Sequence, residues 1–104
     1  MGVWTGEYEN VMYRTPTELD FHSITGGGRY AASGRISYHF DLRGPTLTVD
    51  TGCSASLVAL HLARQALLNG EADVCLAGAA NLVLQPHVNI GYGRSGMLSP
   101  GARC

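Results

Sequence analysis

The sequence contains no lysine, and charged residues of both signs are scarce. Its 104 residues include seven basic residues, all of them arginine, and eight acidic ones, so the net charge is −1. Charged residues make up 14% of the chain, compared with about 25% in typical globular domains. Because proteins that bind nucleic acids need clustered positive charge, this composition excludes a nucleic-acid partner.

Long apolar runs and paired cysteines are also missing. No run approaches the roughly 20 residues that a membrane-spanning helix needs, and the N-terminal residues lack the basic and apolar regions of a signal peptide. The three cysteines, Cys53, Cys75 and Cys104, form no CxxC pair and no zinc-binding pattern. We therefore expect a reduced, cytoplasmic protein with no membrane segment and no metal site.

What remains is a chain with the size of one small domain at most. Hydrophobic residues make up 45% of it, and there are 14 glycines. A chain this short buries only about two-thirds of its unfolded surface, so its core is marginal without support. Low charge and many glycines indicate segments that are buried against parts of a protein outside this chain. We expect residues 1–104 to be a fragment of a larger domain, with no second domain.

The first part of the chain carries weak structural signals. Residues 7–28 are polar and predict irregular structure, apart from a short helix that Thr15 and Pro16 can start. The three glycines at 26–28 are expected to interrupt regular structure. Residues 29–40 follow helical spacing and predict a helix.

The middle of the chain predicts a strand–helix–strand unit over residues 46–78. Residues 46–50 alternate between polar and apolar, which is typical of a strand. A helix is expected from Cys53 to about residue 68; it is apolar nearly all round, which predicts burial. The apolar run 74–78 predicts a central parallel strand. Pro86 can open a further short helix through about Gly93.

Cys53 stands where the predicted strand turns into the predicted helix. This arrangement is typical of a nucleophile elbow, in which a sharp turn lifts the nucleophile above the edge of the sheet. Gly52, Ser54 and Ala55 are as small as such a turn requires. A helix N-terminus offers free N–H groups and positive potential, which favour a thiolate and an oxyanion. The alternative is a buried structural cysteine; Cys75, inside an apolar run, fits that alternative better.

A cysteine nucleophile often needs a histidine as its base. His61 lies eight residues further along the same predicted helix, about 12 Å of rise, and cannot reach Cys53. The other three, His22, His39 and His87, are expected to be surface or locally bonded residues. Two alternatives stay open: a small cysteine-dependent acyl hydrolase that uses His87 or His22, and a non-catalytic interaction fragment built on residues 46–78.

Several linked motifs resemble the β-ketoacyl synthase (ketosynthase) domains of type I polyketide synthases. Residues Val49–Ala63 resemble the active-site signature of that family. The similarity continues before it in Phe40–Pro45, and after it in Gly70–Asp73, Ala77–Leu82 and Ser95–Pro100. Several motifs in the expected order make the resemblance specific, unlike an isolated elbow.

The resemblance implies an α/β fold of the thiolase-like type, layered α/β/α/β/α, of which this chain holds part of the N-terminal half. It also implies an acyltransferase. Cys53 would form an acyl-cysteine intermediate, followed by decarboxylative Claisen condensation with a malonyl-type extender on acyl carrier protein. No cofactor would bind directly, since substrates arrive on the phosphopantetheine of acyl carrier protein. Acyl carrier protein and acyltransferase domains would be partners, and the full domain would form a homodimer.

The resemblance also limits what this chain can do. The two family histidines belong to downstream motifs that no segment here matches, so we expect the isolated fragment to be inactive in condensation. The family's dimer interface uses the strand before the nucleophile, here about Leu47–Asp50. Beside the nucleophile, two positions depart from the family pattern: Gly52 replaces an alanine and Ala55 a serine. Both replacements are small, so we expect the elbow to persist.

Overall fold

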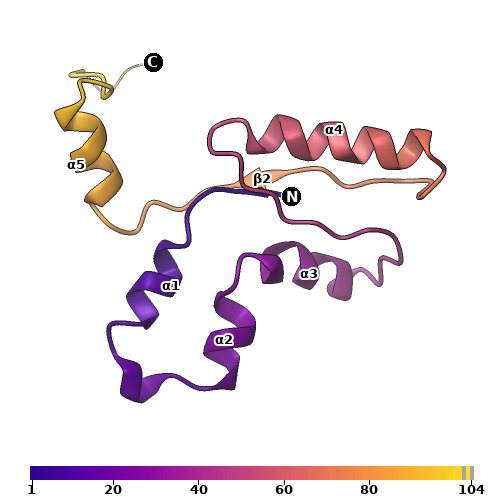
Figure 1. Cartoon of the computed structure of the whole chain (residues 1–104), viewed down its shortest axis with the longest axis horizontal. Coiled ribbons are helices and arrows are strands. Elements are labelled where there is room, and N and C mark those ends of the chain that lie inside the picture. Colours follow the sequence, from indigo (N-terminus) through magenta and orange to yellow (C-terminus); the bar gives the residue numbers. More distant parts are fainter. Residues whose placement is uncertain (102, 104) are drawn as a thin grey trace.

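The structure, a computed structural model, describes residues 1–101 and 103, so Cys104 lies outside the described residues. Short helices and two very short strands follow one another along the chain (Figure 1). In chain order they are β1 (Gly2–Val3), α1 (Glu7–Met12), the 3₁₀ helix η1 (Pro16–Glu18), α2 (Phe21–Gly27), α3 (Tyr30–His39), α4 (Ala55–Leu68), β2 (Ala79–Ala80) and α5 (His87–Arg94).

A short parallel ladder stands at the centre of the chain. β1 pairs with β2, with Gly2 opposite Ala79 and Val3 opposite Ala80. On its other side Gly2 forms a parallel bridge with Val49. Val49 N donates to Met1 O at 2.9 Å, and Val3 N donates to Val49 O at 3.0 Å. β1 therefore lies between the segment before Cys53 and β2.

Helices α3 and α4 lie on opposite sides of this ladder in Figure 1. Hydroxyl pairs attach α3 to the segment before Cys53: Ser33 to Thr48 and Ser37 to Thr46, each at 2.6 Å. The start of α4 lies directly against β1, because a Cβ on Gly2 would come within 2.7 Å of the Ala55 carbonyl carbon. A larger residue at position 2 would push the helix away.

The expectation of irregular structure over residues 7–28 is wrong. Only the short helix after Thr15 was predicted there, and it is present as η1. α1 was missed, and α2 contains two of the three glycines that were expected to interrupt regular structure. A capping box stabilises the start of α2: Ser23 N donates to Asp20 Oδ1 at 2.8 Å, and Asp20 N donates to Ser23 Oγ at 3.2 Å.

The two other helices predicted from local signals are confirmed. α3 occupies nearly all of the predicted 29–40 range. α5 begins directly after Pro86. The segment before α5 is held by the buried carboxylate of Glu7, which accepts the N–H groups of Leu84 at 2.5 Å and Gln85 at 2.8 Å.

The predicted strand–helix–strand unit is only partly correct. Residues 46–50 form a single bridge at Val49 rather than a continuous strand. Residues 74–78 form no strand, and the pairing begins one residue later, at Ala79. The two segments predicted as strands, before and after the helix, do not pair with each other, because β1 lies between them. Each pairs with β1 instead, and β1 comes from the start of the chain, far away in the sequence.

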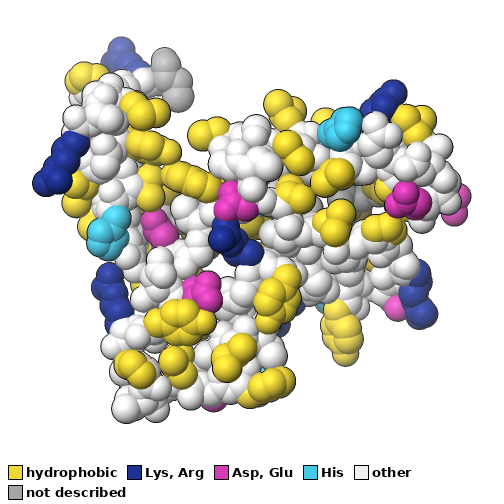
Figure 2. All heavy atoms as spheres, viewed as in Figure 1, with side chains coloured by type: hydrophobic (Ala, Val, Ile, Leu, Met, Phe, Trp, Pro, Cys, Tyr) yellow, Lys and Arg dark blue, Asp and Glu magenta, His cyan; other side chains and the backbone are white. Residues whose placement is uncertain are grey.

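The prediction that the helix after Cys53 is buried is wrong for this chain. Of the described residues in α4, only Ala55 and Ala59 are buried, whereas Leu57 is 69% exposed. Figure 2 shows hydrophobic side chains across this face of the molecule, including the part over α4. The principal extents are 46 × 40 × 17 Å and the radius of gyration is 16.6 Å, against about 13 Å for a compact domain of about 100 residues. Among the described residues, no helix has the length and apolar character that crossing a bilayer requires.

Candidate active site

Cys53 lies in a sharp turn between the ladder and α4, as predicted. Gly52 has φ of +63°, a conformation that glycine adopts without a steric penalty. Ala55 N donates to Gly52 O at 3.1 Å, which closes the turn into the first residue of the helix. The Cys53 thiol is free and the residue is exposed. The chain thus places a cysteine on the surface two residues before a helix begins.

Asp50 and Arg29 hold this turn from the side of the ladder. Gly52 N donates to Asp50 Oδ1 at 3.1 Å. The other carboxylate oxygen of Asp50 forms an ion pair with Arg29 Nη1. The same Arg29 nitrogen donates to the carbonyl oxygen of Trp4 at 3.0 Å. One guanidinium therefore connects the end of β1 to the turn that carries Cys53.

A second set of contacts closes the turn on its helix side. Ser54 Oγ lies 2.8 Å from both the carbonyl oxygen and Oγ1 of Thr51. Although Ser54 is the N-cap residue of α4, its side chain forms no capping bond to the helix. The Ser54 hydroxyl is thus directed to the turn, and it leaves the first-turn N–H groups of α4 free of side-chain capping.

A pocket of about 280 Å³ adjoins Cys53. It is lined by residues of β1 and β2, by the residues that follow these strands and by the first residues of α4. Most of its walls are small residues, and its one large aromatic, Trp4, stacks on Tyr92 with ring centroids 6.2 Å apart. The lining residues are Gly2, Trp4, Gly52, Cys53, Ala55, Ser56, Ala79, Ala80 and Asn81.

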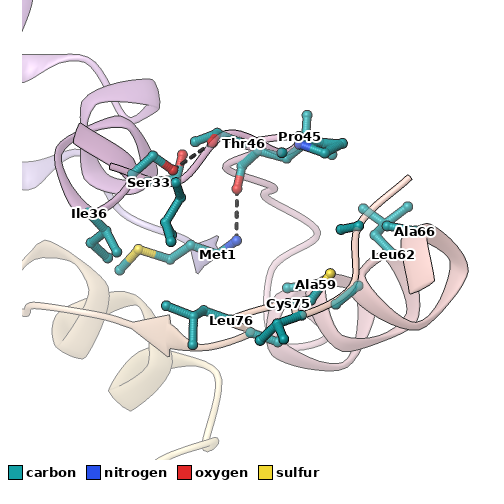
Figure 3. A pocket seen from close by; sticks show the side chains of 18 of the residues that line it. Met1, Ser33, Ile36, Pro45, Thr46, Ala59, Leu62, Ala66, Cys75 and Leu76 are labelled. Carbon is teal, nitrogen blue, oxygen red and sulfur yellow. Dashed lines mark hydrogen bonds between the residues drawn. The ribbon is translucent and has the colours of Figure 1, made fainter. Parts of the chain in front are cut away.

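A larger cavity of about 740 Å³ lies elsewhere, between α3, α4 and the segments that lead into the ladder. Figure 3 shows Met1 reaching into it, with Ile36 and Leu76 among its walls. Its lining is mostly apolar and includes neither Cys53 nor a histidine. Cys53, which the sequence predicts as the nucleophile, lines the smaller pocket instead.

The other predicted residues lie away from Cys53. His22 is in α2 rather than in a loop, His39 ends α3, His61 is within α4 and His87 begins α5. None of them lines the pocket at Cys53, so the hydrolase alternative has no base there. Cys75 is half-buried and lines the larger cavity. In the part of the chain that the structure describes, no three His, Cys, Asp or Glu residues gather as a metal site would need.

Sequence analysis missed four residues around the site: Trp4, Arg29, Asp50 and Asn81. Asp50 had a readable signal, because an aspartate two residues before a glycine often accepts that residue's N–H in a turn. Trp4 and Asn81 reach the pocket because each directly follows a paired strand, and that pairing is not visible in the sequence. Arg29 is 21 positions away from its partner, and only the fold connects them.

Comparison with known families shows to which protein family a chain with this turn belongs. Residues 1–104 match the family described as beta-ketoacyl synthase, N-terminal domain. The chain belongs to the β-ketoacyl synthase family. The fold of this chain is accordingly α/β, part of the N-terminal half of the thiolase-like architecture, which confirms the fold class expected from the motifs.

Similar proteins are polyketide synthases. The chain is 46% identical over 104 residues to the polyketide synthase ThaG of Burkholderia thailandensis, with 96% of this chain and 2% of that protein covered. It is 45% identical over 103 residues to the highly reducing polyketide synthase acrA of Aspergillus aculeatus, with 99% of this chain and 4% of that protein covered. The chain therefore spans a small part of its relatives.

Solved ketosynthase domains have the same architecture. The oxazolomycin ketosynthase domain of Streptomyces albus superposes with a TM-score of 0.81 at 33% identity, covering 99% of this chain and 18% of that one. The ketosynthase from module 6 of the Bacillus subtilis bacillaene synthase reaches a TM-score of 0.76 at 38% identity, covering 99% of this chain and 17% of that one.

Proposed function

We propose that this chain is one part of a polyketide synthase ketosynthase domain and supplies its acyl-accepting cysteine, Cys53. The Cys53 sulfur attacks the carbonyl carbon of an acyl thioester carried on the phosphopantetheine of acyl carrier protein. A new carbon–sulfur bond forms, the bond to the pantetheine sulfur breaks, and that sulfur leaves with the proton that the Cys53 thiol gives up. The product is an acyl-cysteine.

The second step of the proposed reaction forms the carbon–carbon bond. A malonyl-type extender on acyl carrier protein loses carbon dioxide, and its α-carbon attacks the carbonyl carbon of the acyl-cysteine. The Cys53 sulfur leaves, and a β-ketoacyl thioester remains on the carrier. This step needs the two family histidines, and none of the four histidines here matches their motifs. We therefore propose that residues outside these 104 complete it, and that acyltransferase domains and a second copy of the domain are partners.

One observation carries this proposal: the exposed Cys53 thiol, in a positive-φ turn at the start of α4, borders a pocket between α4 and the parallel ladder. A sulfur in that place can be approached by a thioester carbonyl. Free N–H groups in the first turn of a helix can also stabilise the oxyanion that forms on attack. The family membership agrees with the same chemistry.

The test is covalent labelling of the chain with a short radiolabelled acyl thioester. We expect label on the native chain, loss of the label in Cys53→Ala, and retention in the matched control Cys75→Ala, whose thiol lies in the larger cavity. Peptide mapping by mass spectrometry should locate the added acyl mass on the peptide that contains Cys53. Undiminished labelling of Cys53→Ala would reject Cys53 as the acyl acceptor.

A further inference from the structure

We propose that Asp50 and Arg29 are positioning residues for the acylation of Cys53, an inference that rests on the function proposed above. Neither side chain is among the residues that line the pocket. Both act on the residues that do line it, through contacts at the end of β1 and in the turn.

Asp50 sets the conformation of the turn. Its Oδ1 accepts the N–H of Gly52 at 3.1 Å, and Gly52 is the residue with φ of +63° directly before the cysteine. A Cβ on Gly52 would meet no atom within 4 Å, so side-chain packing does not set its conformation. Two hydrogen bonds do: Gly52 N donates to Asp50, and Gly52 O accepts from Ala55 N. The bond to Asp50 is the one that a side chain supplies.

Arg29 links Asp50 to the backbone of Trp4, the residue after β1. Its Nη1 pairs with Asp50 Oδ2 and donates to the Trp4 carbonyl oxygen at 3.0 Å. Trp4 and Cys53 line the same pocket. The guanidinium therefore sets the separation between the wall formed by Trp4 and the turn that carries the nucleophile.

This pair is suited to positioning rather than to holding the whole chain together. The Arg29 and Asp50 side chains are 46% and 34% exposed, and ion pairs with such exposure contribute little to global stability. Small displacements of a reacting group matter far more, since about 1 Å of misplacement can slow a reaction about 100-fold. Loss of the pair is thus expected to affect the acylation rate more than the fold.

The first readout is the rate of Cys53 acylation as a function of thioester concentration. We expect Asp50→Ala to lower the saturating rate about 10-fold or more, because the turn loses both contacts. Asp50→Asn keeps an oxygen for Gly52 N–H and loses only the ion pair, so it should slow acylation less than Asp50→Ala does. Arg29→Ala loses the ion pair and the bond to Trp4. Because Arg29→Ala already removes the ion pair, adding Asp50→Asn to it should slow acylation no further. In these variants the thioester concentration that gives half of the saturating rate should change less than the saturating rate itself. Asp41→Asn is the matched control, because Asp41 pairs with Arg43 on the surface.

The second readout does not depend on acyl transfer. Hydrogen exchange of the Gly52 amide, followed by NMR, should be faster in Asp50→Ala and unchanged in Asp41→Asn. If the native chain is not acylated at all, the proposed function fails and the inference about acylation fails with it, while faster exchange in Asp50→Ala still shows that Asp50 holds the turn. Unchanged exchange in Asp50→Ala overturns the inference. Equal acylation rates of the native chain and Asp50→Ala would also overturn the inference.

Discussion

Two glycines beside Cys53 are required for different reasons. Gly52 adopts φ of +63° in open space, so its role is conformational. Gly2 lacks a positive φ, but its Cα lies directly against the backbone of Ala55 and Ser56. The first permits the turn, and the second permits β1 to lie against the start of α4. Both line the pocket at Cys53.

Replacement of Gly2 by alanine should therefore disturb the site. The added Cβ would lie 2.7 Å from the Ala55 carbonyl carbon and 2.8 Å from its oxygen, and these backbone atoms cannot rotate away. We expect a penalty of about 1–3 kcal/mol, as for other overpacked sites, together with slower acylation of Cys53. Gly78→Ala is the control, because a Cβ there meets no atom within 4 Å. Equal helix content by circular dichroism and equal labelling in the two variants would contradict this account.

At the scale of single elements, α2 depends on its capping box. The backbone N–H of Ser23, followed by its hydroxyl, stabilises the ionised carboxylate of Asp20 and lowers its pKa below the ordinary value of 3.8. The ionised form thus binds the helix N-terminus better than the neutral form does. The stabilisation is fully present above the ordinary pKa and is lost as pH falls through the lowered one.

We therefore expect the start of α2 to fray when the chain is acidified below about pH 4. The amide resonance of Ser23 should shift and its exchange should accelerate along the same titration curve as the Asp20 carboxyl. Asp20→Ala should show the frayed state at neutral pH. Asp20→Asn keeps an acceptor oxygen, so it should remain capped and lose the acid transition. If the chemical shift of the Ser23 amide in the native chain did not change with pH, this role for the capping box would be ruled out.

At the scale of the whole molecule, the described residues form no interior of large side chains. Among the described residues, the buried apolar ones are all alanine: Ala31, Ala55 and Ala59. Leucines of α4 that would fill a core in a compact domain are largely exposed, such as Leu57 at 69% and Leu68 at 64%. Since hydrophobic burial is the main force that opposes chain entropy, these 104 residues have little to stabilise a unique packing.

The isolated chain should therefore bind the dye ANS and unfold without a sharp thermal transition. Leu57→Gln together with Leu68→Gln should improve solubility and leave helix content unchanged, because both side chains are exposed. Ala59→Gln is the contrasting variant: this position is 6% exposed, and a larger side chain there should reduce helix content. A cooperative calorimetric transition of a soluble monomer, without dye binding, would contradict this prediction.

Local signals in the sequence determined α3, α4, α5 and the elbow, although α1 and α2 were missed. Pro86 marked the start of α5, and the small residues around Cys53 indicated a turn into a helix. Such features depend on neighbours within a few positions, where propensity and capping act. The family motifs were readable for the same reason, since they are contiguous.

Only the tertiary structure decided which segments pair and what is buried. β1 has two residues, too few for any periodic signal, yet it stands between the segment before Cys53 and β2. The link from Arg29 to Asp50, the position of Trp4 beside Cys53 and the exposure of α4 all depend on contacts between residues far apart in the chain. Apolar periodicity indicates which face of a helix can be buried, but burial itself requires a neighbour in space.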